Sequence, residues 1–260
     1  MTENVPDLFI QYSRTHPTLV RQRKDYIHFL SGGMAVKLFL VQKGISPNIR
    51  VKTTTDFDFV FAVPNRLTNS QVKMKFESME KLMSKHVYGF QQWLTLKTQL
   101  PIQITKRILT PTVRYNPITK KRVYRVIQFT IQIGNRKPEG LVDATLVYIP
   151  GVKRYQLLRS FTSKFGMPIQ RLKHIYKGVV SVLTGSFSSF AKKNTALGSR
   201  NPLTGKRAEK GLKDTERLNA LIKAKARAST AVKKFILGIK QKNIKKAYKE
   251  ARRILKMKTP

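Results

Sequence analysis

The sequence predicts an α+β domain, with a mixed sheet flanked by helices and a basic, partly helical tail. Stretches with a two-residue apolar period alternate with stretches of helical period over residues 26–185. Hydrophobic residues make up 41% of the 260-residue chain, enough for a packed core. After residue 185, Lys, Arg, Ala and Ser dominate. We therefore expect three regions: an N-terminal segment 1–25, a domain 26–185 and a tail 186–260.

The elements expected in residues 26–185 follow from apolar periodicity and from breaker residues. Strands are expected at Tyr26–Leu30, Thr55–Val63, Ile102–Leu109, Thr112–Tyr115, Arg122–Ile133 and Gly140–Ile149. Helices are expected at Met34–Lys43, Gln71–Trp93 and Pro168–Leu183. Gly44 stands where helices favour a left-handed cap, and Asn116-Pro117 predicts a hairpin turn before residue 122.

Both flanking regions are expected to be helical in part. In residues 1–25, Pro6 lies near a helix start and Pro17 breaks the run. In the tail, Asp214–Ala228 and Ile244–Met257 have the apolar spacing of amphipathic helices.

The charge balance predicts a polyanionic partner. The chain has 52 Lys and Arg against 13 Asp and Glu, a net charge of +39. The tail holds 22 of the basic and four of the acidic residues, so the remainder is strongly basic as well. Self-repulsion of this size is offset by polyanions, which are usually nucleic acid or an anionic membrane surface. We expect nucleic-acid binding through backbone phosphates, and a virion assembly or partner subunit is a further possibility.

Several function classes are excluded or disfavoured. The sequence has no apolar run of about 18 residues, the length that a membrane span needs. The first residues lack the basic-then-apolar layout of a signal peptide, and there is no cysteine for disulfides or thiolate metal sites. The four histidines, His16, His28, His86 and His174, show no metal-ligand spacing. We expect an intracellular or virion setting rather than secretion.

The first motif with chemical potential is Ser31-Gly32-Gly33, between a predicted strand and a predicted helix. A helix start presents unpaired backbone N–H groups and a positive dipole end, which favour phosphate oxygens. Glycine lets a phosphate approach the backbone, and the Ser31 hydroxyl can donate a further hydrogen bond. Taken alone, the motif is a weak signal, because Gly-Gly is common in ordinary strand-to-helix turns.

The second motif is a set of carboxylates in apolar strands. Asp56 and Asp58 lie two residues apart on one predicted strand, so their side chains share a face. Asp143 is a lone acid in another apolar strand. Paired carboxylates repel each other unless divalent cations bind them, and Mg²⁺ suits carboxylates combined with substrate phosphates. The alternative is an exposed strand face whose acids pair with Lys or Arg.

These motifs together resemble the DNA polymerase β superfamily of nucleotidyltransferases. Its members carry a Gly-Gly or Gly-Ser turn, then Asp-x-Asp on the next strand, then a third Asp on a later strand. Gly-Gly-Met-Ala-Val-Lys at residues 32–37 with Thr-Asp-Phe-Asp at 55–58 looks most like poly(A) polymerase catalytic subunits of large DNA viruses. It is also similar to antitoxin-paired bacterial nucleotidyltransferases. The resemblance covers residues 26–185, including Gly-Met-Pro-Ile at 166–169.

The resemblance implies a nucleotidyltransferase-like fold and metal-dependent addition of nucleotides to a nucleic-acid 3′ end. Ser31, Gly32 and Gly33 would then seat a nucleoside triphosphate. Asp56, Asp58 and Asp143 would hold two Mg²⁺ ions as the catalytic set. In the family the third carboxylate is also suited to activating the acceptor hydroxyl.

A second resemblance concerns Arg-Asn-Pro-Leu-Thr-Gly-Lys-Arg at residues 200–207. It looks like an Asn-Pro-x-Thr-Gly-Arg signature that recurs in proteins of large DNA viruses. An ordinary turn is the alternative, because Asn-Pro and Thr-Gly form turns in many proteins.

Two functions remain open from the sequence. One is the nucleotidyltransferase, which the three carboxylates favour. The other is a basic structural virion protein, minor capsid or genome-binding, on an inactive nucleotidyltransferase fold. The small size, the +39 charge and the tail favour the second. A ribosomal protein would match the composition but would not explain Asp-x-Asp.

Overall fold

The computed structural model describes residues 4–22, 26–42, 44, 56–111, 121–150, 158–159 and 162–170, together with single residues between 234 and 253. The chain divides into two units. The first comprises residues 1–34, 55–112 and 122–171, and the second comprises residues 35–54, 113–121 and 172–260. The first unit contains the sheet and the candidate site.

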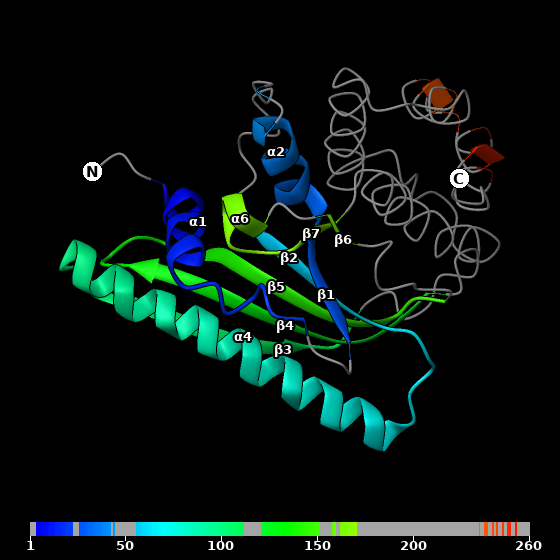
Figure 1. Cartoon of the computed structure of the whole chain (residues 1–260), viewed down its shortest axis with the longest axis horizontal. Helices are drawn as coiled ribbons and strands as arrows, with labels where there is room; N and C mark the ends of the chain where they lie inside the picture. The colour runs from blue at the N-terminus through cyan, green and yellow to red at the C-terminus, as the bar shows by residue number, and fades with distance from the viewer. Residues whose placement is uncertain are drawn as a thin grey trace, which may run out of the picture. The chain divides into compact units, whose positions relative to one another are not determined.

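Seven strands form one mixed sheet in the order β3-β4-β5-β2-β1-β7-β6 (Figure 1). The pairs β2–β5 and β1–β7 are parallel, and the other neighbours are antiparallel. The strands are β1 Ile27–Ser31, β2 Phe57–Val63, β3 Ile102–Leu109, β4 Arg122–Ile133, β5 Glu139–Tyr148, β6 Leu158–Arg159 and β7 Ile169–Gln170. The helices are α1 Val5–Thr15, α2 Gly32–Gln42, α4 Asn69–Thr98 and α6 Thr162–Phe165.

The predicted fold class is therefore confirmed: the protein is α+β, with a mixed sheet and flanking helices. The strands predicted at Ile102–Leu109 and Arg122–Ile133 have the observed bounds. Gly44 has the positive φ, +69°, expected of a left-handed cap. α1 ends at Thr15, just before Pro17, as predicted.

One predicted element is wrong where the structure describes it. The helix predicted from Pro168 does not begin there, because Ile169 and Gln170 form β7. The Leu30 N–H donates to the Pro168 carbonyl at 2.7 Å, and Ile169 pairs with Leu30 in parallel. Tertiary pairing with β1 thus prevails over local helical periodicity.

Other predictions lie outside the described residues. They are the strand Thr112–Tyr115, the Asn116-Pro117 turn, the helix residues 171–183, the tail helix Asp214–Ala228 and the motif at 200–207. Of the predicted tail helix Ile244–Met257, the structure describes only isolated residues, so this helix also stays a prediction. The predicted region boundaries at residues 25 and 185 stay predictions.

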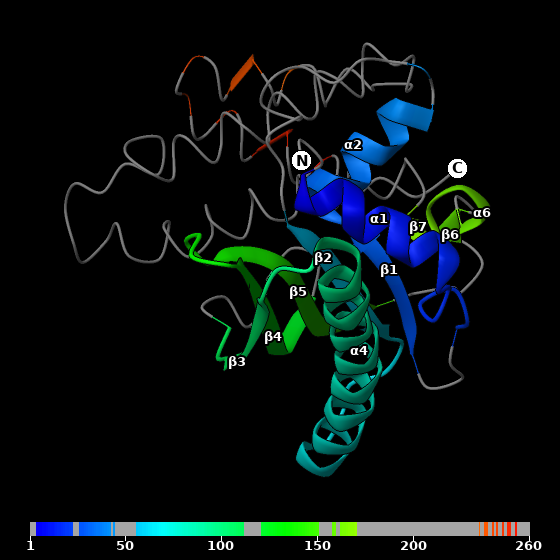
Figure 2. The ribbon, with the colours of Figure 1, turned by 90° about the vertical axis from the view of Figure 1, so that its left-hand side faces the viewer.

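α4 is longer than the predicted Gln71–Trp93 because both of its ends are capped. Thr68 and Gln71 form a capping box, in which each side chain bonds the other residue's backbone N–H. Gln99 ends the helix in the left-handed conformation, with φ of 57°. α4 lies along one face of the sheet and contacts β3, β4 and β5 (Figures 1 and 2). Its sheet-facing side includes Phe76, Met79, Leu82, Met83, Val87, Phe90 and Leu94, all buried.

α1 belongs to the same core, although its composition is more polar than that of the strands. Phe9 is fully buried, with its ring centroid 4.6 Å from that of Phe57 on β2. Ser13 donates to the Phe9 carbonyl and lies 3.0 Å from Nε2 of buried His86 on α4. The Thr18 hydroxyl lies within hydrogen-bonding distance of His86 Nδ1. Since Ser13 uses its proton on Phe9, His86 fits as a neutral ring that donates from Nε2 and accepts at Nδ1.

The two faces of β2 differ because its residues alternate. Phe57, Phe59 and Phe61 are fully buried, and Phe57 packs against α1. Asp58 and Val60 are only partly buried and point to the opposite face. This second face carries the candidate site.

Candidate metal centre

Asp58 and Asp143 are direct neighbours in the sheet. β2 and β5 run parallel, with Asp58 in register with Asp143. Residues in register point to the same face of a sheet, so the two carboxyl groups lie side by side. Phe57 and Val142, the preceding pair, are both fully buried on the other face. The apolar alternation of both strands therefore fixes the direction of the two acids.

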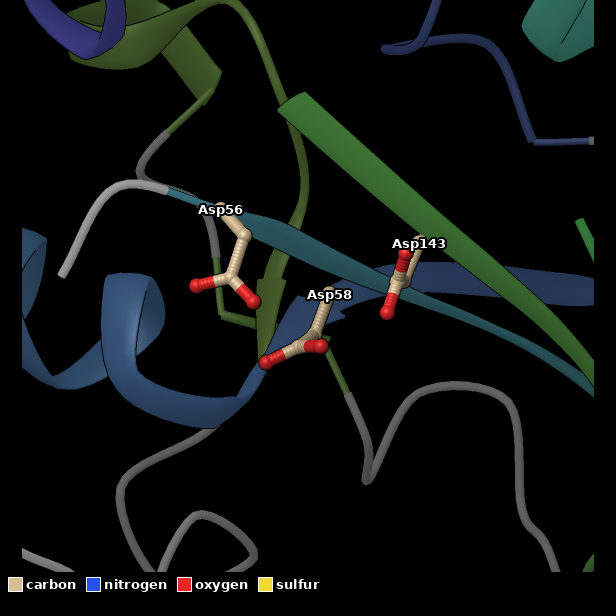
Figure 3. A group of neighbouring side chains, drawn as sticks. All are labelled: Asp56, Asp58 and Asp143. Atoms are coloured by element: carbon tan, nitrogen blue, oxygen red, sulfur yellow. The ribbon is translucent and has the colours of Figure 1, made fainter. Parts of the chain in front are cut away.

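Asp56 completes the cluster from the residue directly before β2. The structure thus corrects the predicted strand start at Thr55, since β2 begins at Phe57. Asp56, Asp58 and Asp143 each offer a carboxylate oxygen, and these oxygens lie within 4.8 Å of one another. All three residues are partly buried, and their carboxyl groups project to the same side of the strands (Figure 3).

Three converging carboxylates could hold a metal ion. Three carboxylates whose oxygens lie within 4.8 Å repel one another when no cation lies between them. A bound divalent cation removes that repulsion, and carboxylate oxygens are the ligands that hard cations such as Mg²⁺ prefer. The donor set, all oxygen and without sulfur or imidazole, fits such a cation. Among the described residues this is the one cluster with that property.

Ser31, the last residue of β1, adjoins the cluster. It pairs with Asp58 across the antiparallel β1–β2 ladder. Its hydroxyl donates to the Asp58 backbone carbonyl at 3.4 Å, a long hydrogen bond. The predicted contact between Ser31 and a phosphate stays a prediction.

Gly32 occupies the turn from β1 into α2. Its φ is +67°, a backbone conformation that residues other than glycine rarely adopt. A Cβ atom on Gly32 would lie 2.0 Å from Oδ2 of Asp58. The glycine therefore makes room for the Asp58 carboxylate, a purpose that the sequence did not indicate. Phosphate binding by Gly32 and Gly33 remains a prediction.

Gln128 is a member of the site that the sequence analysis missed. It lies on β4 in register with Asp143, and its Nε2 donates to Asp143 Oδ1 at 3.1 Å. The alternation of β4 places Gln128 opposite the buried Ile127 and Phe129. That alternation is visible in the sequence, but pairing with Asp143 depends on the β4–β5 register.

Two histidines are core residues remote in sequence from these acids. His86 is fully buried, and burial, followed by the nearby charge of His16, lowers its pKa to about 3. His28 is also fully buried, with Nε2 at 2.7 Å from the Leu19 carbonyl oxygen.

Among the helices that the structure describes, none has the length and apolar character to cross a bilayer.

No protein-family profile matches the chain, and no curated protein matches it in sequence. Among solved structures, the Megavirus polyadenylate synthase is similar at 11% identity with a TM-score of 0.38. The match covers 88% of this chain, which spans 37% of the length of the Megavirus protein. At this TM-score and identity, the similarity says nothing about activity or substrate.

Proposed function

We propose that the protein is a metal-dependent nucleotidyltransferase that adds nucleotides to the 3′ end of a nucleic acid. The observation that carries this proposal is the convergence of Asp56, Asp58 and Asp143, whose carboxylate oxygens lie within 4.8 Å of one another. Two adjacent parallel strands and the residue before one of them supply these acids. Such a set on a rigid sheet is the arrangement that phosphoryl transfer with two metal ions requires.

In this proposal the three acids hold two Mg²⁺ ions, which would neutralise charge on the attacking and leaving oxygens during transfer. Asp58 is seated by Gly32, and Asp143 is held by Gln128. The turn at Gly32-Gly33 opens α2, so its backbone N–H groups are suited to bind the triphosphate. Asp143 is the acid proposed to orient the acceptor hydroxyl.

The acceptor is proposed to be a nucleic acid because the chain has a net charge of +39. Lys and Arg contacts to phosphates give affinity without sequence readout. ATP is the first nucleotide to test, because the motifs at residues 32–37 and 55–58 resemble those of viral poly(A) polymerases.

A second candidate function is a basic structural virion protein, such as a minor capsid or genome-binding protein, on an inactive nucleotidyltransferase fold. The observation favouring it is the size of the charge excess, 52 basic against 13 acidic residues. Lys and Arg contacts to phosphates bind nucleic acid without sequence readout, which suits a genome-binding role.

The test is nucleotide incorporation onto labelled RNA, and separately DNA, with Mg²⁺ or Mn²⁺. The matched control carries Asp56→Ala and Asp58→Ala. Extension by the native protein that the double variant lacks supports the enzyme. No extension, with tight and salt-dependent nucleic-acid binding by both proteins, overturns the enzyme and supports the structural protein.

A further inference from the structure

A row of four polar residues crosses the sheet at the candidate site. Ser31 pairs with Asp58, Asp58 with Asp143, and Asp143 with Gln128, from β1 through β2 and β5 to β4. Because in-register partners share a face, all four side chains lie on the face opposite α4. The row continues the metal centre one strand beyond the three acids.

The Gln128 side chain lies at the candidate site and not in the core. Its strand neighbours Ile127 and Phe129 are fully buried on the α4 face, whereas Gln128 is partly buried. The hydrogen bond from Nε2 to Asp143 Oδ1 is 3.1 Å long. A carboxylate only accepts, so the amide nitrogen, and not the amide oxygen, must face Asp143.

The amide chemistry suits a carboxylate that must hold a cation. An apolar side chain at residue 128 would leave Oδ1 of Asp143 without its amide donor. A Lys or Arg would orient the carboxylate but would also neutralise the negative charge that attracts a metal. A glutamine donates the hydrogen bond and adds no charge.

We propose that Gln128 is a positioning residue of the metal centre, fixing the Asp143 carboxylate so that it converges with Asp56 and Asp58. This inference rests on the proposed function, because it requires those acids to hold metal. Partners that orient metal-binding carboxylates contribute about 10- to 100-fold to metal affinity or activity.

The experiment measures Mn²⁺ binding by electron paramagnetic resonance, and nucleotide incorporation as a function of Mn²⁺, for Gln128→Leu. The matched control is Gln132→Leu, on the same strand and face, because Gln132 donates to the Gly134 carbonyl and not to an acid. We expect Gln128→Leu to weaken Mn²⁺ binding about 10-fold. Saturating Mn²⁺ should restore most of kcat, while Gln132→Leu should resemble the native protein. If the leucine variant unfolds, Gln128→Met replaces it.

A double-mutant cycle with Asp143→Ala separates positioning from a merely structural role. If Gln128 acts through Asp143, Gln128→Leu has no further effect on Mn²⁺ affinity once Asp143 is alanine. Equal losses in both backgrounds overturn the inference, as does native-like Mn²⁺ affinity in the single variant. In either of these cases native Mn²⁺ binding and extension leave the proposed function standing. Absence of Mn²⁺ binding by the native protein overturns both.

Discussion

Gly32 lies against the carboxylate of Asp58, so that a Cβ atom at residue 32 would come within 2.0 Å of Oδ2. The turn between β1 and α2 and the second acid of the cluster therefore occupy one tightly packed site. The motif Ser31-Gly32-Gly33 and the motif Asp56-Phe57-Asp58 are structurally coupled through this contact.

Replacing Gly32 with alanine should displace the Asp58 side chain and weaken metal binding by at least about 10-fold, comparable with loss of a partner that orients a metal ligand. The positive φ adds a backbone cost of about 1–2 kcal/mol. Mn²⁺ affinity and urea unfolding measure the two effects. Gly44→Ala is the control, because Gly44 has a φ of +69° and, its chain neighbours apart, no atom of the described residues lies within 4 Å of its Cβ position. Equal Mn²⁺ affinity in the two variants would contradict the coupling of Gly32 to Asp58.

Metal should stabilise the folded protein, because a ligand that binds only the folded state adds about 2.7 kcal/mol at 100 times its dissociation constant. We expect thermal unfolding of the native protein to shift upward with added Mn²⁺. The shift should be lost in Asp58→Asn, which keeps the side-chain size but removes the charge. Glu77→Gln, on exposed α4 surface, is the control and should keep the shift. A shift of equal size in Asp58→Asn would place the bound metal elsewhere.

His86 should make stability depend on pH. Its folded-state pKa of about 3 is below the ordinary value of 6.5, so on acidification the unfolded chain takes up a proton that the folded protein excludes. The stability contribution is complete above pH of about 6.5 and is lost as the pH falls toward 3. Between pH 7 and pH 5 the free energy of unfolding should fall by about 2 kcal/mol, measured by urea titration. His86→Gln, which cannot titrate, should show a smaller fall, and an unchanged fall would exclude His86 as its source.

The N-terminal helix should be required for the stability of the sheet domain. Phe9 is fully buried against Phe57, so Phe9→Ala should cost about 3–5 kcal/mol in the free energy of unfolding. Gln11→Ala on the exposed side of the same helix should cost less than about 0.5 kcal/mol. Similar small losses in both variants would show that α1 contributes little to the core.

The elements whose burial follows from their own sequence were predicted well. Alternation along β2 placed Asp58 opposite three phenylalanines, and the breaker residues around Gly44 and Pro17 ended helices as expected. The three acids were recognised because charged residues inside apolar strands conflict with burial.

Features that depend on strand register or on tertiary packing could not be predicted from the sequence. β7 forms because Ile169 meets Leu30, and no local pattern at residues 168–170 indicates that pairing. Gln128 joins the site through the β4–β5 register, and Gly32 makes room for Asp58 through a contact between the β1–α2 turn and β2. These relationships join residues far apart in sequence, which a single sequence does not encode as a local pattern.

The most direct measurement is a crystal structure with Mn²⁺ and a non-hydrolysable ATP analogue, using the anomalous signal to locate the ions. We predict Mn²⁺ bound by Asp56, Asp58 and Asp143, with the triphosphate against the turn at Gly32-Gly33. A structure with no Mn²⁺ at these acids, and with each acid paired to a Lys or Arg side chain, would contradict this prediction.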